Sequence, residues 1–121
     1  MRLTQPINRA FATCADNVAI IDGGITRVWR DVHDRVARGA GVLQGMGVAT
    51  GDRVAILAEN SSTYFELYHA VPWAGGVIVP INTRLTDVEV ANILIDSGAK
   101  CLLYSPGLAE KASVAATRAG T

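Results

Sequence analysis

The sequence predicts an α/β fold, in which a parallel sheet of βαβ units carries flanking helices and follows an N-terminal β-hairpin. Three observations lead to this prediction. Short apolar runs suited to buried strands alternate with longer segments of helical periodicity. Glycines and capping residues stand where one kind of segment gives way to the next. Consecutive strand–helix–strand units imply right-handed crossovers and a sheet covered on both faces.

A short helix and a hairpin are expected first. Residues 6–15 should be helical, with Phe11 as the apolar anchor. Residues 18–21 and 26–29 favour two short strands. Asp22-Gly23-Gly24 between them is a strong hairpin signal, because glycine adopts positive φ without steric cost.

A long helix is predicted over residues 30–46. Apolar residues recur along it at helical spacing, and charged residues mark the opposite face. Gly47 is well placed to end the helix as a left-handed C-cap. The expected core face comprises Val32, Val36, Ala40 and Leu43.

The middle of the chain should supply the centre of the sheet. Residues 53–58 are an almost wholly apolar run, which is typical of a central parallel strand. A helix should follow from about residue 61 to about residue 74, with Thr63 and Glu66 forming a capping box. Residues 77–79 are expected to be the next strand.

A second capping box, Thr86 with Glu89, should open a helix that Gly98 closes. Residues 100–104 are expected to be a further short strand, and the segment from residue 106 a weak, alanine-rich helix. The apolar face expected for the middle helix comprises Val88, Ala91 and Ile95.

Composition narrows the range of functions. The 121 residues make one domain or part of one; half of them are apolar and the formal net charge is zero. Disorder is therefore not expected, and no excess of positive charge points to nucleic acid. No apolar run approaches the roughly 20 residues needed to span a bilayer. Cys14 and Cys101 stand far apart, without metal-ligand spacing, and should be reduced thiols in the cytoplasm.

Two loops are candidates for ligand binding. Residues 59–62 and 82–86 follow predicted parallel strands, and ligands of open parallel sheets bind beyond the carboxyl ends of the strands. Each loop ends at a helix start whose free N–H groups favour an anion, and Arg84 could hold a phosphate bidentately. In the alternative interpretation, Asn60 and Asn82 tie turns and Arg84 is a solvated surface charge.

Other candidate groups favour structural roles. The sequence contains neither G-x-x-x-x-G-K-[ST] nor G-x-G-x-x-G after a strand, and it lacks G-x-S-x-G. His33 and His69 fit surface or packing positions better than catalytic ones. Asp31 and Asp34 could bind a cation on one helix turn, but neighbouring arginines make helix-surface ion pairs the better account.

Several motifs resemble those of the AMP-forming acyl-CoA synthetases, within the adenylate-forming family. Residues 47–56 read G-V-A-T-G-D-R-V-A-I, close to the family's G-V-x-x-G-D-R-V-A-I. Residues 73–82, W-A-G-G-V-I-V-P-I-N, resemble its K-A-G-x-x-x-V-P-L-N, and residues 96–100 are D-S-G-A-K. The resemblance covers nearly all of the chain, although Pro72 and Trp73 depart from the usual pattern.

The resemblance implies a two-step reaction. A carboxylate attacks ATP, with Mg²⁺ balancing the phosphate charge, to give an acyl-adenylate and pyrophosphate; coenzyme A (CoA) then takes the acyl group. The family's phosphate loop, its acidic nucleotide-binding residues and its catalytic lysine would fall beyond Thr121. Residues 1–121 are thus expected to be a partial N-terminal subdomain of the large N-terminal domain. Alone it should lack catalytic and metal residues, stay inactive, and bind ATP, Mg²⁺ and CoA only as part of the full-length enzyme.

Only Arg84 can be carried over from the family pattern, as a residue able to contact the phosphates of CoA. A carboxylic acid and CoA would be the partners of the full-length enzyme. Two alternatives remain open. One is a stand-alone or truncated binding or interaction module without enzymatic activity, which pairs with a partner or with itself through an unpaired sheet edge and exposed apolar faces. The other is a small flavodoxin-like nucleotide binder.

Overall fold

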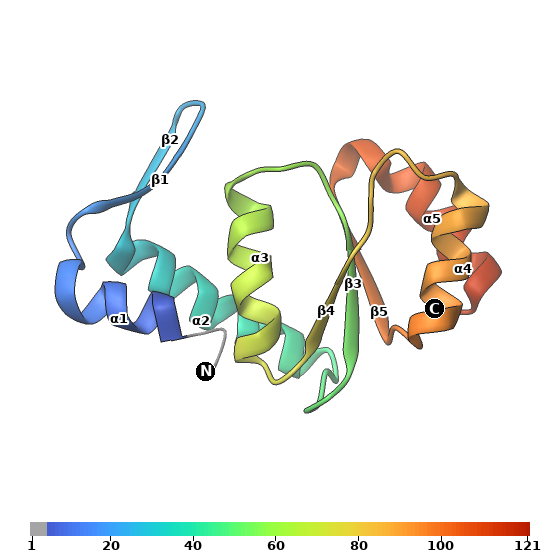
Figure 1. Cartoon of the computed structure of the whole chain (residues 1–121), viewed down its shortest axis with the longest axis horizontal. Helices are drawn as coiled ribbons and strands as arrows, with labels where there is room; N and C mark the ends of the chain where they lie inside the picture. Colours follow the sequence, from blue (N-terminus) through green and yellow to red (C-terminus); the bar gives the residue numbers. More distant parts are fainter. Residues whose placement is uncertain (1–4) are drawn as a thin grey trace.

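The computed structural model describes residues 5–121 and has the predicted α/β architecture (Figure 1). A two-stranded antiparallel hairpin precedes a three-stranded parallel sheet of order β4-β3-β5. The helix α3 lies on one side of this sheet and α4 with α5 on the other (Figure 1). The elements are α1 (Gln5–Cys14), β1 (Val18–Asp22), β2 (Ile25–Val28), α2 (Trp29–Gly45), β3 (Arg53–Leu57), α3 (Ser62–Trp73), β4 (Val77–Pro80), α4 (Asp87–Ser97), β5 (Cys101–Tyr104), the 3-10 helix η1 (Pro106–Leu108) and α5 (Ala109–Ala119).

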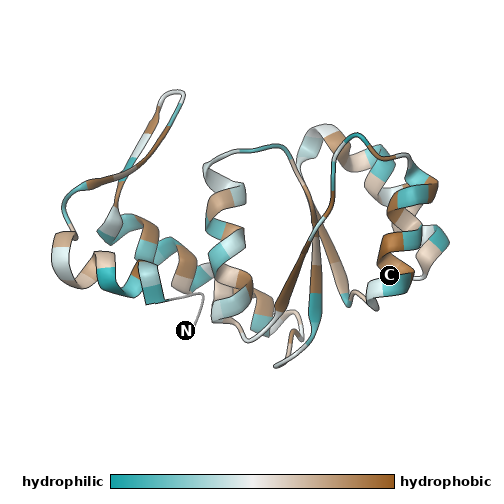
Figure 2. Cartoon of the chain, in the orientation of Figure 1, coloured by the Kyte–Doolittle hydropathy of each residue, from teal (hydrophilic) through white to brown (hydrophobic). Residues whose placement is uncertain are grey.

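The central strand β3 supplies both hydrophobic cores. Its side chains alternate between the faces of the sheet, as the two-residue period of a strand requires. Val54 and Ile56 belong to the core formed with α1, α2 and α3, whereas Ala55 and Leu57 belong to the core formed with α4 and α5. All four are fully buried, which confirms the prediction of a central parallel strand. Figure 2 shows hydrophobic colouring along the strands of the parallel sheet.

The long helix α2 is as predicted. Its four expected core residues are all buried, and they pack with α3. A Cβ at Gly39 would lie 3.3 Å from the Cβ of Ala70, so a small residue there lets the two helices approach closely. After the helix ends, Gly47 has a φ of +96°, which confirms its role as the left-handed residue of the C-terminal cap.

The anchor of α1 was predicted wrongly. Ile7 is the buried residue of this helix, with 1% of its surface exposed. Phe11 is only half-buried, and its ring stacks on His33 with a centroid separation of 4.2 Å. Ile7 lies one turn before Phe11 on the same face, so helical spacing alone did not distinguish between them.

The predicted capping box at Thr63 and Glu66 is also wrong. The N-cap of α3 is Ser61, whose Oγ accepts a hydrogen bond from the Tyr64 N–H at 3.1 Å. Glu66 is instead buried and paired with arginines, as described below. The second capping box is confirmed, since Thr86 Oγ1 accepts from the Glu89 N–H at 3.2 Å.

The buried face of α4 differs from the prediction in two of its three residues. Val90, Ala91 and Leu94 face the core, whereas Val88 and Ile95 are 42% and 58% exposed. Apolar residues surround this helix on nearly all sides, so its periodicity does not select one face. Gly98, with a φ of +65°, ends the helix as predicted.

Candidate functional site

The two predicted ligand loops lie at the same end of the sheet. All three parallel strands end there, at Leu57, Pro80 and Tyr104 (Figure 1). Backbone hydrogen bonds extend the pairing into the loops: the Ile81 N–H donates to the Ile56 carbonyl at 2.9 Å, and the Ser105 N–H to the Leu57 carbonyl at 3.1 Å. The fold thus brings residues 59–62 and 82–86 to the carboxyl end of the sheet, where such folds bind ligands.

Protein oxygens already occupy the N-terminus of α3. The Ser62 N–H donates to Oδ2 of Asp22 at 2.8 Å, and the Ser61 hydroxyl caps the Tyr64 N–H. Asp22 is the last residue of β1, so a carboxylate of the hairpin lies where an anionic ligand was expected. Sequence reasoning missed this contact because it joins residues 40 positions apart.

The N-terminus of α4 is capped by its own residues. Besides the Thr86 cap, Asp87 Oδ1 accepts from the Val88 N–H at 2.8 Å. Asn82 Oδ1 accepts from the Arg84 N–H at 2.9 Å, which confirms that Asn82 ties a turn. Lys111 of α5 braces this loop by donating to the Thr83 carbonyl at 2.8 Å.

The Arg84 side chain takes no part in these contacts, which involve only its backbone N–H. It is exposed, and within residues 5–121 no carboxylate lies at ion-pair distance from its guanidinium group. Two acidic residues, Asp87 and Glu89, stand in the first turn of the adjoining helix. The geometry leaves the Arg84 guanidinium available to an anion outside the described residues.

An ion triad with a buried carboxylate joins the hairpin, α2 and α3. Glu66 is 7% exposed, and its Oε1 lies 2.8 Å from Nε of Arg35 and 3.3 Å from Nε of Arg27. The hydrogen bond to Glu66 raises the pKa of Arg35 above its ordinary value, so this guanidinium stays charged. The sequence offered one signal for the triad, an acidic residue among the apolar positions of α3.

A second polar cluster lies at the amino end of the sheet. Asp52 Oδ2 accepts from the Ala49 N–H at 2.8 Å and lies 3.3 Å from Nζ of Lys100, which donates to the Gly47 carbonyl at 2.6 Å. The Ala49 hydrogen bond and, next, Lys100 lower the pKa of Asp52. This cluster is far along the strands from the ligand loops, and it ties the turn before β3 to the start of β5.

The remaining candidate groups have packing or ion-pair contacts. His33 stacks on Phe11 and meets Trp73 edge-on at 5.2 Å, and His69 packs against Phe65 at 4.8 Å. Asp34 pairs with Arg38 at 2.7 Å along α2. No group of three metal-ligating side chains occurs among residues 5–121.

Cys101 lacks the surroundings of an activated thiol. Cys14 and Cys101 are both free. Burial raises the pKa of the Cys101 thiol, which disfavours the reactive thiolate. No helix of the described part of the chain is long and apolar enough to cross a bilayer.

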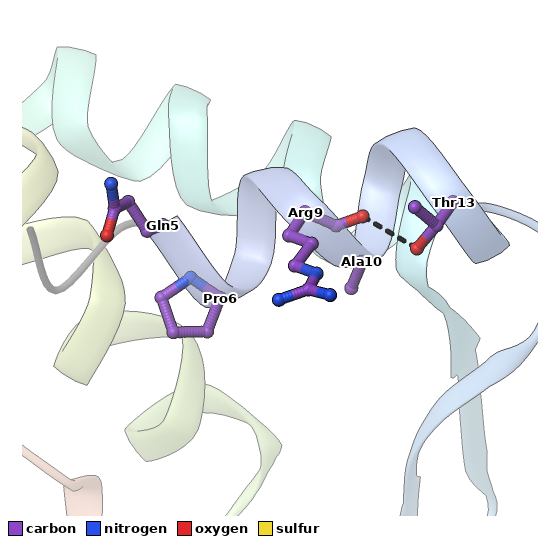
Figure 3. Close-up of a pocket in the computed structure, with 5 residues that line it drawn as sticks. All are labelled: Gln5, Pro6, Arg9, Ala10 and Thr13. Atoms are coloured by element: carbon purple, nitrogen blue, oxygen red, sulfur yellow. Dashed lines mark hydrogen bonds between the residues drawn. The ribbon is translucent and has the colours of Figure 1, made fainter. Parts of the chain in front are cut away.

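Two of the hollows lined by residues 5–121 lie on the N-terminal side of the molecule. One, of about 620 Å³, runs along the outer side of α1 and is drawn in Figure 3. Arg9 is the only charged residue among the five described residues that line it, which Figure 3 draws along α1. The other, of about 380 Å³, lies between β1 and the loop that precedes α3.

Comparison with known proteins identifies the family. The family model described as AMP-binding enzyme matches residues 7–120. A feruloyl-CoA synthase from an Amycolatopsis species is 43% identical over 115 residues, which are 95% of this chain and 23% of that protein. The peroxisomal trans-cinnamate:CoA ligase of Petunia hybrida is 38% identical over 106 residues, 88% of this chain and 19% of that protein.

The fold agrees with this result. The crystal structure of a putative long-chain-fatty-acid CoA ligase from Rhodopseudomonas palustris superposes with a TM-score of 0.90 at 32% identity. The superposition covers 97% of this chain and 30% of that one. The chain therefore spans about a fifth of the curated relatives that it matches. With the parallel sheet, the family model and the relatives in agreement, the chain belongs to the AMP-binding enzyme family.

Proposed function

We propose that residues 1–121 form a partial N-terminal subdomain of an acyl- or aryl-CoA synthetase. The complete enzyme would convert a carboxylic acid and ATP, with Mg²⁺, into an acyl-adenylate, and then transfer the acyl group to CoA. The observation that carries this proposal is the family match over residues 7–120. The names of the relatives, which specify both aromatic acids and fatty acids, support it.

The role proposed for this part is to supply sheet and packing surface. Its helix starts at the carboxyl end of the sheet are capped by protein oxygens, and its buried carboxylate, Glu66, pairs with two arginines of the same chain. Residues outside this stretch would then bind ATP and carry out both steps. The purified 121-residue chain, given ATP, Mg²⁺ and a panel of aromatic and fatty acids, should release no pyrophosphate above background.

A chimera tests whether this stretch can serve as the N-terminal part of an active synthetase. The matching 115 residues of the Amycolatopsis feruloyl-CoA synthase would be replaced by those of this chain. We expect the chimera to fold and retain its synthase activity, because the shared stretch is structural. A folded but inactive chimera would contradict the proposal, as would pyrophosphate release by the 121-residue chain alone.

Arg84 is proposed to contact a phosphate of CoA in the complete enzyme. Its exposed guanidinium at the carboxyl end of the sheet supports this role. In the chimera, Arg84→Ala should raise the KM for CoA about tenfold, since a charge-assisted hydrogen bond contributes about 1.5 kcal/mol. Pyrophosphate release without CoA should stay unchanged. Arg118→Ala, on the exposed end of α5, is the matched control.

A second candidate function is a non-catalytic module that self-associates. Large apolar side chains on the surface favour it, among them Ile21, which is 75% exposed, and Ile95. Sedimentation of the 121-residue chain should then show a concentration-dependent dimer, and a monomer at all concentrations would exclude this function. For both candidate functions the proposed location is the cytoplasm, and fractionation of the native cells would test this location.

A further inference from the structure

The hairpin β1–β2, unlike the helices of the sheet, buries little apolar surface against the rest of the molecule. Its strands pair only with each other among the described residues, in a two-stranded sheet. Ile20, at 9% exposure, is its one buried side chain, whereas Val18, Ile21 and Ile25 are exposed. Two-stranded hairpins are marginally stable on their own in water. The hairpin therefore depends on its contacts with the body of the protein.

Besides the burial of Ile20 and the packing of Ala19, those contacts are polar. At the tip, Asp22 Oδ2 accepts from the Ser62 N–H at 2.8 Å. In the return strand, Nε of Arg27 lies 3.3 Å from Oε1 of Glu66. Ser62 and Glu66 both belong to α3. This helix therefore holds the hairpin by contacts with two charged side chains of the hairpin, those of Asp22 and Arg27.

The base of the hairpin is fixed by backbone hydrogen bonds. The Trp29 N–H donates to the Asn17 carbonyl at 3.1 Å, and the Arg30 N–H to the Ala15 carbonyl at 2.8 Å. The hairpin is thus tied firmly at its base and by charges near its tip. In Figure 1 it stands out from the helices at one end of the molecule.

A hollow already exists beneath the hairpin. The space of about 380 Å³ lies between residues 19–22 of the hairpin and residues 60–62 with Phe65. Residues 60–62 lead from the central strand into α3, so the hairpin covers the N-terminal end of α3, which itself lies between the hairpin and the sheet (Figure 1). Movement of the hairpin would uncover this space without displacing any residue of β3.

We infer that β1–β2 is a latched arm: when its contacts with α3 break, the hairpin detaches from the N-terminus of α3, and its two strands, marginally stable by themselves, unpair. Opening breaks the Asp22 and Arg27 contacts and exposes Ile20 together with the half-buried Ala19. The parallel sheet and the core on the α4–α5 face stay intact, whereas the other core loses these two side chains. The arm therefore opens by a local transition, at a lower free energy than global unfolding.

Native-state hydrogen exchange of the 121-residue chain tests this inference. Hairpin amides should exchange at least tenfold faster than those of β3. Asp22→Ala should accelerate hairpin exchange about tenfold, as loss of one charge-assisted hydrogen bond predicts, and leave β3 amides unchanged. Asp16→Ala is the matched control, because it removes the exposed Asp16–Arg30 pair at the base. It should change neither region.

A second measurement needs no variant. Raising NaCl to about 1 M screens partly exposed ionic contacts and should accelerate hairpin exchange in the wild-type protein. The inference is overturned if hairpin and β3 amides exchange together. It is also overturned if neither Asp22→Ala nor salt changes hairpin exchange, or if Asp16→Ala has the same effect as Asp22→Ala.

Discussion

The two strand-to-helix junctions at the carboxyl end of the sheet are built by different means. At the β4–α4 junction the backbone N–H groups have local partners: Asn82, Thr86 and Asp87 accept hydrogen bonds from N–H groups one to three residues further on. The β3–α3 junction combines the local Ser61 cap with a distant one, since Asp22 of the hairpin accepts from the Ser62 N–H. Junctions of the first kind can be read from sequence, whereas those of the second kind require the fold.

The largest expected effect concerns α4, where local signals set the ends of the helix but not its buried face. Leu94→Ala should lower the free energy of unfolding by about 3 kcal/mol, because it leaves a cavity in the core. Ile95→Ala, on the exposed face, should cost about 0.5 kcal/mol or less. Urea unfolding measures both. Equal losses would mean that the helix is rotated from its described position.

The ion triad extends the comparison to α3. Glu66→Ala should lower the free energy of unfolding, measured in urea, by about 2 kcal/mol, because it leaves Arg27 and Arg35 without their carboxylate partner. Both arginines are partly exposed, so the loss should be smaller than for a fully buried pair. Glu89→Ala in the first turn of α4 is the matched control, and it should cost about 0.5 kcal/mol. A loss from Glu66→Ala no greater than the control would show that the triad contributes no stability.

The local cap of α4 should have a smaller effect. Thr86→Ala should lower the free energy of unfolding by about 1 kcal/mol, the usual value for an N-cap hydroxyl. Because this cap is neutral and local, its contribution should be the same at low and high salt. Thr63→Ala, at a position that does not cap α3, should be nearly neutral. A larger loss from Thr63→Ala would restore the capping box predicted from sequence.

The smallest expected effect is a pH dependence at the other end of the sheet. The Ala49 hydrogen bond and Lys100 lower the pKa of Asp52 in the folded protein. Asp52 therefore stabilises the fold above about pH 4, its ordinary pKa, and this contribution is lost as pH falls through the lowered value. Asp52→Asn should reduce stability at pH 7 and lessen its decline in acid. Asp96→Asn, on the exposed side of α4, should follow the wild type.

Sequence patterns predicted the order of elements, the central strand and the core face of α2. These predictions were correct because α2 has one apolar stripe and β3 is one apolar run, so each pattern allows only one set of residues to be buried. Prediction failed at Ile7, Glu66 and Ile95, where several residues satisfied the same local pattern. It also missed Asp22 at the start of α3. The positions of all four residues depend on contacts between elements that are distant in sequence, and local sequence patterns do not encode such contacts.

The alternation of β3 between two cores has a consequence for synthesis on the ribosome. The core on the α2–α3 face draws its fully buried residues from the chain before residue 75, whereas the other face needs α4 and α5. As the chain emerges from its N-terminus, the first core can assemble while Ala55 and Leu57 still face water. We expect this nascent intermediate to be the form that chaperones bind, until residues 90–115 arrive to cover the second face.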